Sequence, residues 1–329
     1  MDRKQALIAW TQKSLADPEC YLKPASSDAS FRSYWRVFSQ SNTYIVMDAP
    51  VEHENSSTFV DVSRKLTAAG LQVPIVYSKN LDDGFLLLSD LGTVQYLDIL
   101  TEDNCQTLYT DAISALHTIQ QKASQKNLPL YDQQLLNDEL NLFSDWFIDK
   151  HLGFSLSERQ SKVINNCHMI LIDNAQQQAQ TFVHRDYHSR NLMKTASHNP
   201  GILDFQDAVI GPVTYDLVSL LKDCYIAWPS TLVNQFSDQF RINYNGLNNT
   251  EINAETWQRW FDLMGIQRHL KAIGIFCRLN YRDHKPNYLK DINRTLCYVK
   301  TCCNKYPELN EFLELLHEMS PSMANICEH

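Results

Sequence analysis

The 329-residue chain has no apolar run long enough to cross a membrane. A spanning helix needs roughly 18 to 20 consecutive apolar residues, and no stretch of this sequence approaches that length. The first residues, Met1 to Gln5, are mostly charged or polar and lack the apolar core of a secretory signal peptide. We therefore expect a cytoplasmic protein that has no membrane partner.

Paired cysteines and net positive charge are missing as well. The nine cysteines are scattered without a C-x-x-C pair, which favours buried reduced thiols over disulfides or a zinc site. The formal net charge of -9 argues against a nucleic-acid partner, because such proteins usually carry a basic surface.

The chain does have enough apolar residues, 44% of the total, to bury a large core. Its pattern predicts a small β-rich lobe over residues 1–91, which would bind a nucleotide, and a larger, mostly helical lobe over residues 92–329. The elements expected in the first lobe are a helix over 4–16, strands at 34–38, 43–47, 73–77 and 84–88, and a helix that is capped by Ser56 or Ser57 and stopped by Gly70.

The most informative stretch runs from His184 to Asn191 and is followed by a second apolar strand that ends at Asp204. Phosphoryl transfer needs a carboxylate that accepts the proton of a substrate hydroxyl, and oxygen ligands that hold Mg²⁺ on the nucleotide phosphates. Asp186 suits the first role, and Asn191 with Asp204 suits the second. The spacing therefore predicts a kinase-type catalytic loop.

Two neighbours of this loop are expected to shape it. His184 is interpreted as an inward-packed side chain that hydrogen-bonds backbone, and Asp216 as a helix cap that braces the loop.

Two segments of the first lobe are candidates for nucleotide contact. The small polar run from Ser26 to Arg32 is placed to cover phosphates, although it has no glycine. The bend at Ser89, Asp90 and Leu91 follows an apolar strand and would hold adenine through backbone groups.

These motifs resemble those of the aminoglycoside phosphotransferase and choline kinase-like superfamily, which has a bilobal protein-kinase-like α+β fold. More narrowly, four stretches are similar to the anomeric N-acetylmuramate and N-acetylglucosamine kinases of peptidoglycan recycling; they are residues 27–32, 47–50, 203–208 and 281–283. The resemblance implies ATP and Mg²⁺ as cofactors, Asp186 as catalytic base, Asn191 and Asp204 as metal ligands, and an α-1-phosphate product. It also implies that Ser30 and Arg32 belong to a nucleotide-covering loop.

One departure from the kinase pattern concerns the third strand, which carries Met47 where kinases usually have a lysine. Arg32 is the best candidate for a substitute cation. Glu54 or Glu52 would then be a carboxylate that lacks its usual partner.

The acceptor is the least constrained part of the prediction. Residues 257–294 hold eight Lys or Arg against three Asp, and the candidate contacts there are Arg278, Tyr281 and Arg282, with Lys271 on the same helix face. This segment suits an anionic sugar such as N-acetylmuramate, or it is a solvated basic face. Asp207 is placed to contact the substrate or a second metal ion, or to cap a turn.

The sequence thus predicts an ATP-dependent sugar 1-kinase with no obligate protein partner. Two alternatives stay open: a kinase of the same fold for an aminoglycoside, amino alcohol or hydroxy amino acid, and a nucleotide-binding pseudokinase.

Overall fold

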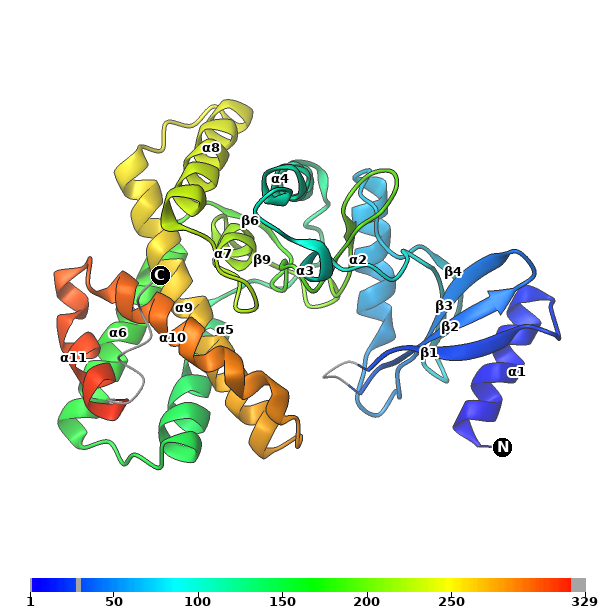
Figure 1. Ribbon diagram of the computed structural model, residues 1–329, viewed down its shortest axis with the longest axis horizontal. Helices are drawn as coiled ribbons and strands as arrows, with labels where there is room; N and C mark the ends of the chain where they lie inside the picture. The colour runs from blue at the N-terminus through cyan, green and yellow to red at the C-terminus, as the bar shows by residue number, and fades with distance from the viewer. Residues whose placement is uncertain (1, 28–30, 321–329) are drawn as a thin grey trace. The chain divides into compact units, whose positions relative to one another are not determined.

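A computed structural model of the protein describes residues 2–27 and 31–320 (Figure 1). The chain forms two compact units. Unit 1 combines Met1–Ser124 with Arg190–Ala208, and unit 2 combines Gln125–Ser189 with Val209–His329. This division differs from the predicted lobes 1–91 and 92–329, because residues 92–124 and 190–208 also belong to unit 1. Gln72 bridges to Gly201, and Gln95 bridges to Met193.

Unit 1 is built on a five-stranded antiparallel sheet with the strand order β1-β2-β3-β5-β4. The strands are β1 (Tyr21–Ser27), β2 (Ser33–Ser39), β3 (Asn42–Asp48), β4 (Val76–Asn80) and β5 (Phe85–Ser89). The hairpin and the strand predicted at 84–88 are confirmed. The strand predicted at 73–77 begins later, and Pro74 gives the reason, since proline has no N–H to donate to a ladder.

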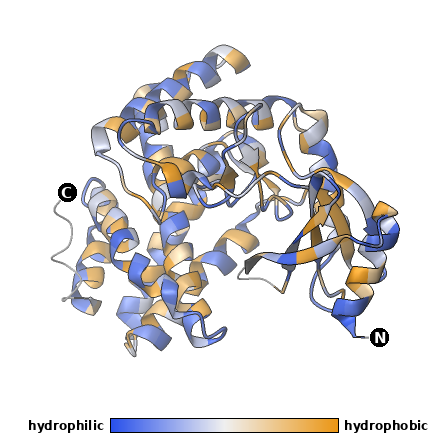
Figure 2. Ribbon diagram, turned by 45° about the vertical axis from the view of Figure 1, so that its right-hand side comes forward, coloured by the Kyte–Doolittle hydropathy of each residue, from blue (hydrophilic) through white to orange (hydrophobic). Residues whose placement is uncertain are grey.

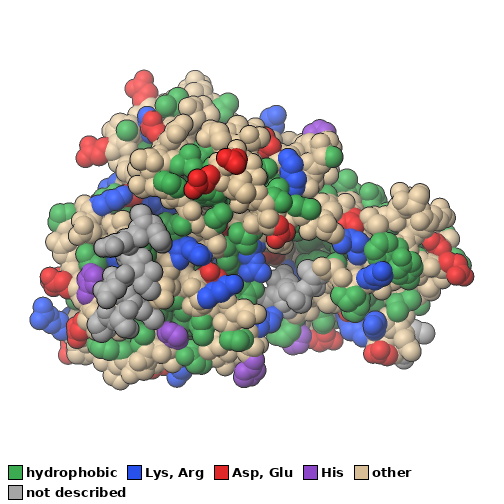
Figure 3. Space-filling model, viewed as in Figure 1, with side chains coloured by type: hydrophobic (Ala, Val, Ile, Leu, Met, Phe, Trp, Pro, Cys, Tyr) green, Lys and Arg blue, Asp and Glu red, His purple; other side chains and the backbone are tan. Residues whose placement is uncertain are grey.

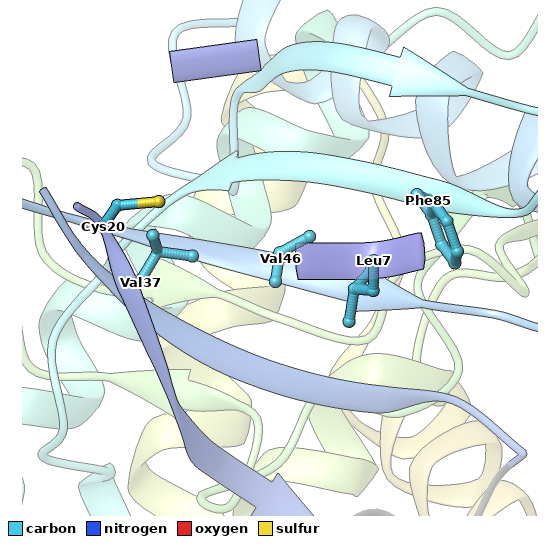
Figure 4. Packing of buried hydrophobic residues seen from close by; sticks show 5 residues of the cluster. All are labelled: Leu7, Cys20, Val37, Val46 and Phe85. Atoms are coloured by element: carbon cyan, nitrogen blue, oxygen red, sulfur yellow. The ribbon is translucent and has the colours of Figure 1, made fainter. Parts of the chain in front are cut away.

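Helix α1 (Arg3–Leu15) packs against β5 of this sheet and confirms the first predicted helix. Its Leu7 joins Cys20, Val37, Val46 and Phe85 in a buried cluster (Figure 4). The sheet therefore has a core of its own. Figure 2 shows hydrophobic residues (orange) interspersed with hydrophilic ones (blue) along the strands and helices.

Helix α2 (Ser56–Ala68) confirms the second predicted helix and buries a face that includes Phe59, Val62 and Leu66. Its predicted cap is wrong: the side chain of Asn55 accepts the Ser57 N–H at 3.0 Å. Unit 1 is completed by α3 (Tyr96–Ile99), α4 (Cys105–Lys122), β7 (Leu192–Met193) and β8 (Gly201–Ile202).

Unit 2 is mostly helical, with one short antiparallel pair formed by β6 (Gln180–Val183) and β9 (Val209–Pro212). Its helices are α5 (Gln133–Leu142), η1 (Phe143–His151), α6 (Glu158–Gln177), α7 (Tyr215–Leu221), α8 (Ser230–Asn248), α9 (Ala254–Tyr281), η2 (Pro286–Asp291), α10 (Ile292–Cys303), η3 (Pro307–Leu309) and α11 (Asn310–Met319). A sheet-bearing unit beside a mostly helical one confirms the predicted α+β class.

Helix α9 is the longest of these and is contacted by α5, η1, α6, α7, α8 and α10. Close approach to α5 depends on Gly274, because a Cβ there would lie 2.4 Å from the carbonyl carbon and oxygen of Leu142. The segment that follows Leu142, η1 (Phe143–His151), is π-helical, which is a rare form.

Among the described residues, no helix is long and apolar enough to span a bilayer. The eight cysteines in this part of the chain are all free thiols, and seven of them are buried, as predicted.

Candidate active site

The catalytic loop begins where β6 ends. Strand β6 is held by its antiparallel pairing with β9, which matches Val183 to Val209. His184 is fully buried, and its Nδ1 accepts the Asp186 backbone N–H at 3.3 Å. The inward, backbone-bonded role predicted for His184 is confirmed.

Two buried carboxylates fix the loop by accepting hydrogen bonds from it. Asp216, near the start of α7, accepts the backbone N–H groups of His184 at 2.6 Å and Arg185 at 3.0 Å, which confirms the predicted brace. Its predicted role as the helix cap is wrong, because the N-cap of α7 is Thr214. Asp223 accepts the Ser189 backbone N–H at 3.0 Å and its hydroxyl at 2.6 Å. Burial raises the pKa of Asp216 to about 7, although its two backbone hydrogen bonds oppose the rise.

Asp223 was not found from the sequence, where an aspartate at the end of an apolar helix carries no distinguishing signal. Both ends of the loop are thus fixed by carboxylates that come from the α7 region, and the backbone of Asp186 is held between them.

Asp186 is surrounded by positive charge within unit 2. Burial alone would raise its pKa, but nearby Lys271, His188, Arg185 and Arg268 outweigh burial, and the pKa lies below its usual value. The carboxylate is therefore ionised at neutral pH and can accept a proton.

Glu139 on α5 organises two of these cations. Its buried carboxylate pairs with Arg185 and with Lys271, whose Nζ lies 2.9 Å away, and it also accepts the hydroxyl of Tyr131. Arg185 itself has left-handed backbone, with φ of 77°. Glu139 was missed by sequence reasoning, because it lies 46 residues from Arg185 along the chain.

The predicted metal ligands lie together in unit 1. Asn191 precedes β7 and Asp204 follows β8, and the pairing of these strands brings Asn191 Nδ2 within 3.4 Å of Asp204 Oδ2. The Leu203 N–H donates to the Asn191 carbonyl at 2.9 Å. Asp204 has φ of 64°, and Phe205 packs on Phe59 of α2 with ring centroids 4.8 Å apart.

These two side chains fit a Mg²⁺ ion, which prefers hard oxygen ligands and keeps several waters or phosphate oxygens. Within residues 2–27 and 31–320, no cluster of three or more His, Cys, Asp or Glu could hold a metal by itself. A site of one carboxylate and one carboxamide therefore suits an ion that arrives with a nucleotide rather than a resident metal.

Arg32, the predicted substitute for the missing strand lysine, is paired with Glu54. Met47 is fully buried in β3, whereas Arg32 Nη2 lies 2.6 Å from Glu54 Oε2. Burial opposes the charged form of Arg32, but Tyr34, Glu54, Asp207 and Asp204 raise its pKa.

Glu54 is therefore not the unpartnered carboxylate that was expected, since Arg32 pairs with it much as a kinase lysine pairs with its glutamate. Asp207 itself is exposed. Contact of Arg32 with nucleotide phosphates, and of Asp207 with substrate, stay predictions.

The other predicted nucleotide contacts are placed as follows. Ser30 lies outside the described residues. The Ser89 N–H donates to the Ile75 carbonyl at 2.9 Å, and the Asp90 carboxylate is held by a fork from Arg36 at 2.6 and 3.1 Å. Since these groups are engaged within the sheet, adenine contact at the bend, including Leu91, would use the remaining backbone groups.

Half of the eight cations in the basic segment 257–294 are paired with acids. Four of its cations have acidic partners: Arg259 with Glu308, Lys271 with Glu139, Arg282 with Asp283, and Arg294 with Asp291. Lys271 is buried rather than part of a solvent-facing patch, which corrects the expected basic face. Figure 3 shows Lys and Arg interspersed with Asp and Glu on the face drawn.

Comparison with known proteins identifies the family to which the chain belongs. Residues 22–260 match the phosphotransferase enzyme family. A protein of Pseudomonas putida named N-acetylmuramate/N-acetylglucosamine kinase is 41% identical, over 96% of each chain. A protein of the same name from Pseudomonas aeruginosa is 43% identical, over 95% of this chain and 96% of its own.

Solved structures with similar folds include an ADP-bound aminoglycoside phosphotransferase, with a TM-score of 0.59, 14% identity, and coverage of 91% of this chain and 98% of that one. A choline kinase from Streptococcus pneumoniae has a TM-score of 0.60 at 12% identity and covers 91% of this chain and 100% of its own. These structures confirm the predicted kinase-like fold.

Proposed function

The chain belongs to the phosphotransferase enzyme family, and from this premise we propose that it is an ATP-dependent kinase that phosphorylates the anomeric hydroxyl of N-acetylmuramate, N-acetylglucosamine or both. The observation that carries the proposal is the ionised carboxylate of Asp186, which lies among cations in a loop held by Asp216 and Asp223. The amino-sugar acceptor is supported by the names of relatives that match nearly the whole chain.

In the proposed reaction Asp186 accepts or orients the proton of the sugar hydroxyl as that oxygen attacks the γ-phosphorus of ATP. Asn191 and Asp204 would hold Mg²⁺, which neutralises charge on the phosphates. Arg32, charged and paired with Glu54, would orient the α and β phosphates in place of a strand lysine. The loop's rigidity contributes by keeping the base positioned before substrate arrives.

The acceptor test is a panel of amino sugars incubated with ATP and Mg²⁺, with the product read by phosphorus NMR. We expect a sugar 1-phosphate from N-acetylmuramate, N-acetylglucosamine or both. The panel also includes an aminoglycoside, an amino alcohol and a hydroxy amino acid, and turnover of one of these alone would replace the proposed acceptor. No turnover with any acceptor would favour a pseudokinase.

The base assignment has its own test. Asp186→Ala should abolish phosphate transfer, because no other group would accept the proton, while ATP binding measured by calorimetry is retained. The matched control is Asp238→Ala, which removes an exposed carboxylate on α8 and should leave turnover unchanged. Undiminished turnover of Asp186→Ala would refute the role of Asp186.

We also propose that the enzyme works in the cytoplasm, where its substrate ATP is abundant.

A further inference from the structure

Three cations recur at helical spacing along one face of α9 and its C-cap: Lys271, Arg278 and Arg282. Of these three, only Arg278 lacks an acidic partner in the described part of the chain. Lys271 is paired with Glu139 at 2.9 Å, and Arg282 with Asp283 at 2.8 Å. Arg278 has no ion pair and no hydrogen bond from its side chain to any described residue, and its Nε is buried.

The missing partner matters because Arg278 is not a freely solvated surface residue. Its side chain is half buried, and burial together with the nearby charge of Arg282 lowers its pKa, against a smaller opposing effect of Asp283. A partly desolvated guanidinium without an anion is costly, and a ligand carboxylate would relieve that cost through a two-pronged hydrogen bond.

A second unpaired guanidinium on the same helix can be set apart. Arg268 is 6% exposed and lies 3.8 Å from the Cys224 sulfur, with Asp186 and Asp223 supporting its charge. Arg268 is thus enclosed under the loop, whereas Arg278 is partly open to solvent.

The packing of α9 places Arg278 beyond the base. Three contacts occur in the same order along α9 and along α5 with η1: Lys271 with Glu139, Gly274 with Leu142, and Tyr281 with His151. Of these contacts, the one at Lys271 is nearest the proposed base, because the charge of Lys271 lowers the pKa of Asp186. Arg278 is seven residues further, about 10 Å along the helix and on the same face.

The far end of this face offers groups suited to a sugar. Tyr281 is 45% exposed, and its hydroxyl is held by His151 Nδ1 at 3.1 Å, which fixes an aromatic ring beside Arg278. Burial lowers the pKa of His151, so that this residue is neutral at pH 7 and Arg278 supplies the positive charge.

We propose that Arg278 is a specificity-determining residue that binds the carboxylate of an acidic amino-sugar acceptor, whereas a neutral amino sugar binds without it. The inference rests on the proposed sugar kinase function and deepens it. It assigns the acidic substrate a contact in unit 2 that the neutral substrate cannot make.

The test compares N-acetylmuramate, which has a carboxylate, with N-acetylglucosamine, which does not, using Arg278→Met. We expect kcat/KM for N-acetylmuramate to fall about 10- to 100-fold, through KM rather than kcat, because a charged hydrogen bond made equally in ground and transition states is lost. The value for N-acetylglucosamine should change less than about threefold. Arg278→Lys, which keeps the charge but loses the fork, should be intermediate.

The matched control is Arg259→Met on the same helix, since this arginine is paired with Glu308 and its removal should not discriminate between the two sugars. Thermal denaturation of each variant shows that folding is intact, and removal of an unpaired half-buried cation should not lower the Tm. Equal losses for both sugars, or no loss for N-acetylmuramate, would overturn the role of Arg278 while leaving the kinase assignment in place. A wild-type enzyme that phosphorylates neither sugar would instead overturn the proposed function, and this inference with it.

Discussion

Replacing Glu139 with glutamine should destabilise the protein far more than replacing an exposed glutamate does. The change is nearly isosteric and removes one negative charge. It leaves Arg185 and Lys271, both largely buried, without the carboxylate that neutralises them. Tyr131 also loses a charged acceptor for its buried hydroxyl.

The magnitude follows from the burial of the pair. Glu139 has 6% of its side chain exposed, Lys271 10% and Arg185 18%. Breaking a buried ion pair by removing one partner costs about 3 to 5 kcal/mol, because the remaining charge stays desolvated. For a chain of this size we expect the Tm to fall by about 5 to 10 °C.

The control is Glu308→Gln, which breaks the pair with Arg259 where the side chains are 37% and 43% exposed. Exposed pairs contribute about 0 to 1 kcal/mol, so the Tm should move by less than about 2 °C. Both variants are measured by thermal denaturation at pH 7 and by kcat at 25 °C. Glu139→Gln should also lower kcat, because Arg185 adjoins the base and is held by Glu139.

A double variant measures the energetic coupling between Glu139 and Lys271. Adding Lys271→Met to Glu139→Gln removes one of the two stranded cations, so the pair of changes should cost at least about 1 kcal/mol less than the sum of the single changes. If Glu139→Gln melts within about 2 °C of the wild type, or if the two changes are additive, then Glu139 does not compensate these charges and the reasoning is refuted.

Three further predictions follow from other buried charges. Burial alone would raise the pKa of Asp262, but Lys222 and Lys305 outweigh burial and lower it to about 2. Because this pKa is lower in the folded state than in the unfolded state, the Asp262 carboxylate stabilises the protein above its unfolded pKa of about 4. That stabilisation is lost as the pH falls toward 2. Asp262→Asn should therefore reduce the free energy of unfolding by about 2 kcal/mol at pH 7, and the difference from wild type in urea titrations should shrink between pH 4 and pH 2; a constant difference would contradict the assignment. Asp216→Asn replaces one of the two carboxylate acceptors with an amide donor that faces a backbone N–H. It should therefore reduce the free energy of unfolding by about 1 to 3 kcal/mol and lower kcat, with little change in KM for ATP. An unchanged kcat would show that the loop does not need this brace. Arg32→Met should raise KM for ATP about tenfold and leave acceptor KM unchanged, whereas an unaltered nucleotide KM would remove this arginine from the phosphate site.

Local patterns in the sequence were enough to predict much of unit 1 and the reacting groups. The alternation and turn residues of the hairpin predicted β2 and β3, because strand pairing across a short turn is a local property. The role of His184 was also predictable, since its backbone partner, Asp186, is two residues away. Errors arose where a neighbour changed a boundary, as with Asn55 at the start of α2 and Pro74 before β4.

What the sequence by itself determined is the identity and order of the groups that we propose for phosphoryl transfer: Asp186 and Asn191 share one loop, and Asp204 follows one short hairpin later. Only the tertiary structure decided which charges are satisfied. Glu139 pairs with Lys271 across 132 positions of the chain, so that Lys271 is part of a buried ion pair and not of the predicted basic face. Arg278 is then the partly exposed cation of this face that has no acidic partner among the described residues. The physical reason is that a charge's effect depends on its burial and on its partner, and both are set by the packing of α5 against α9 rather than by neighbours in the chain.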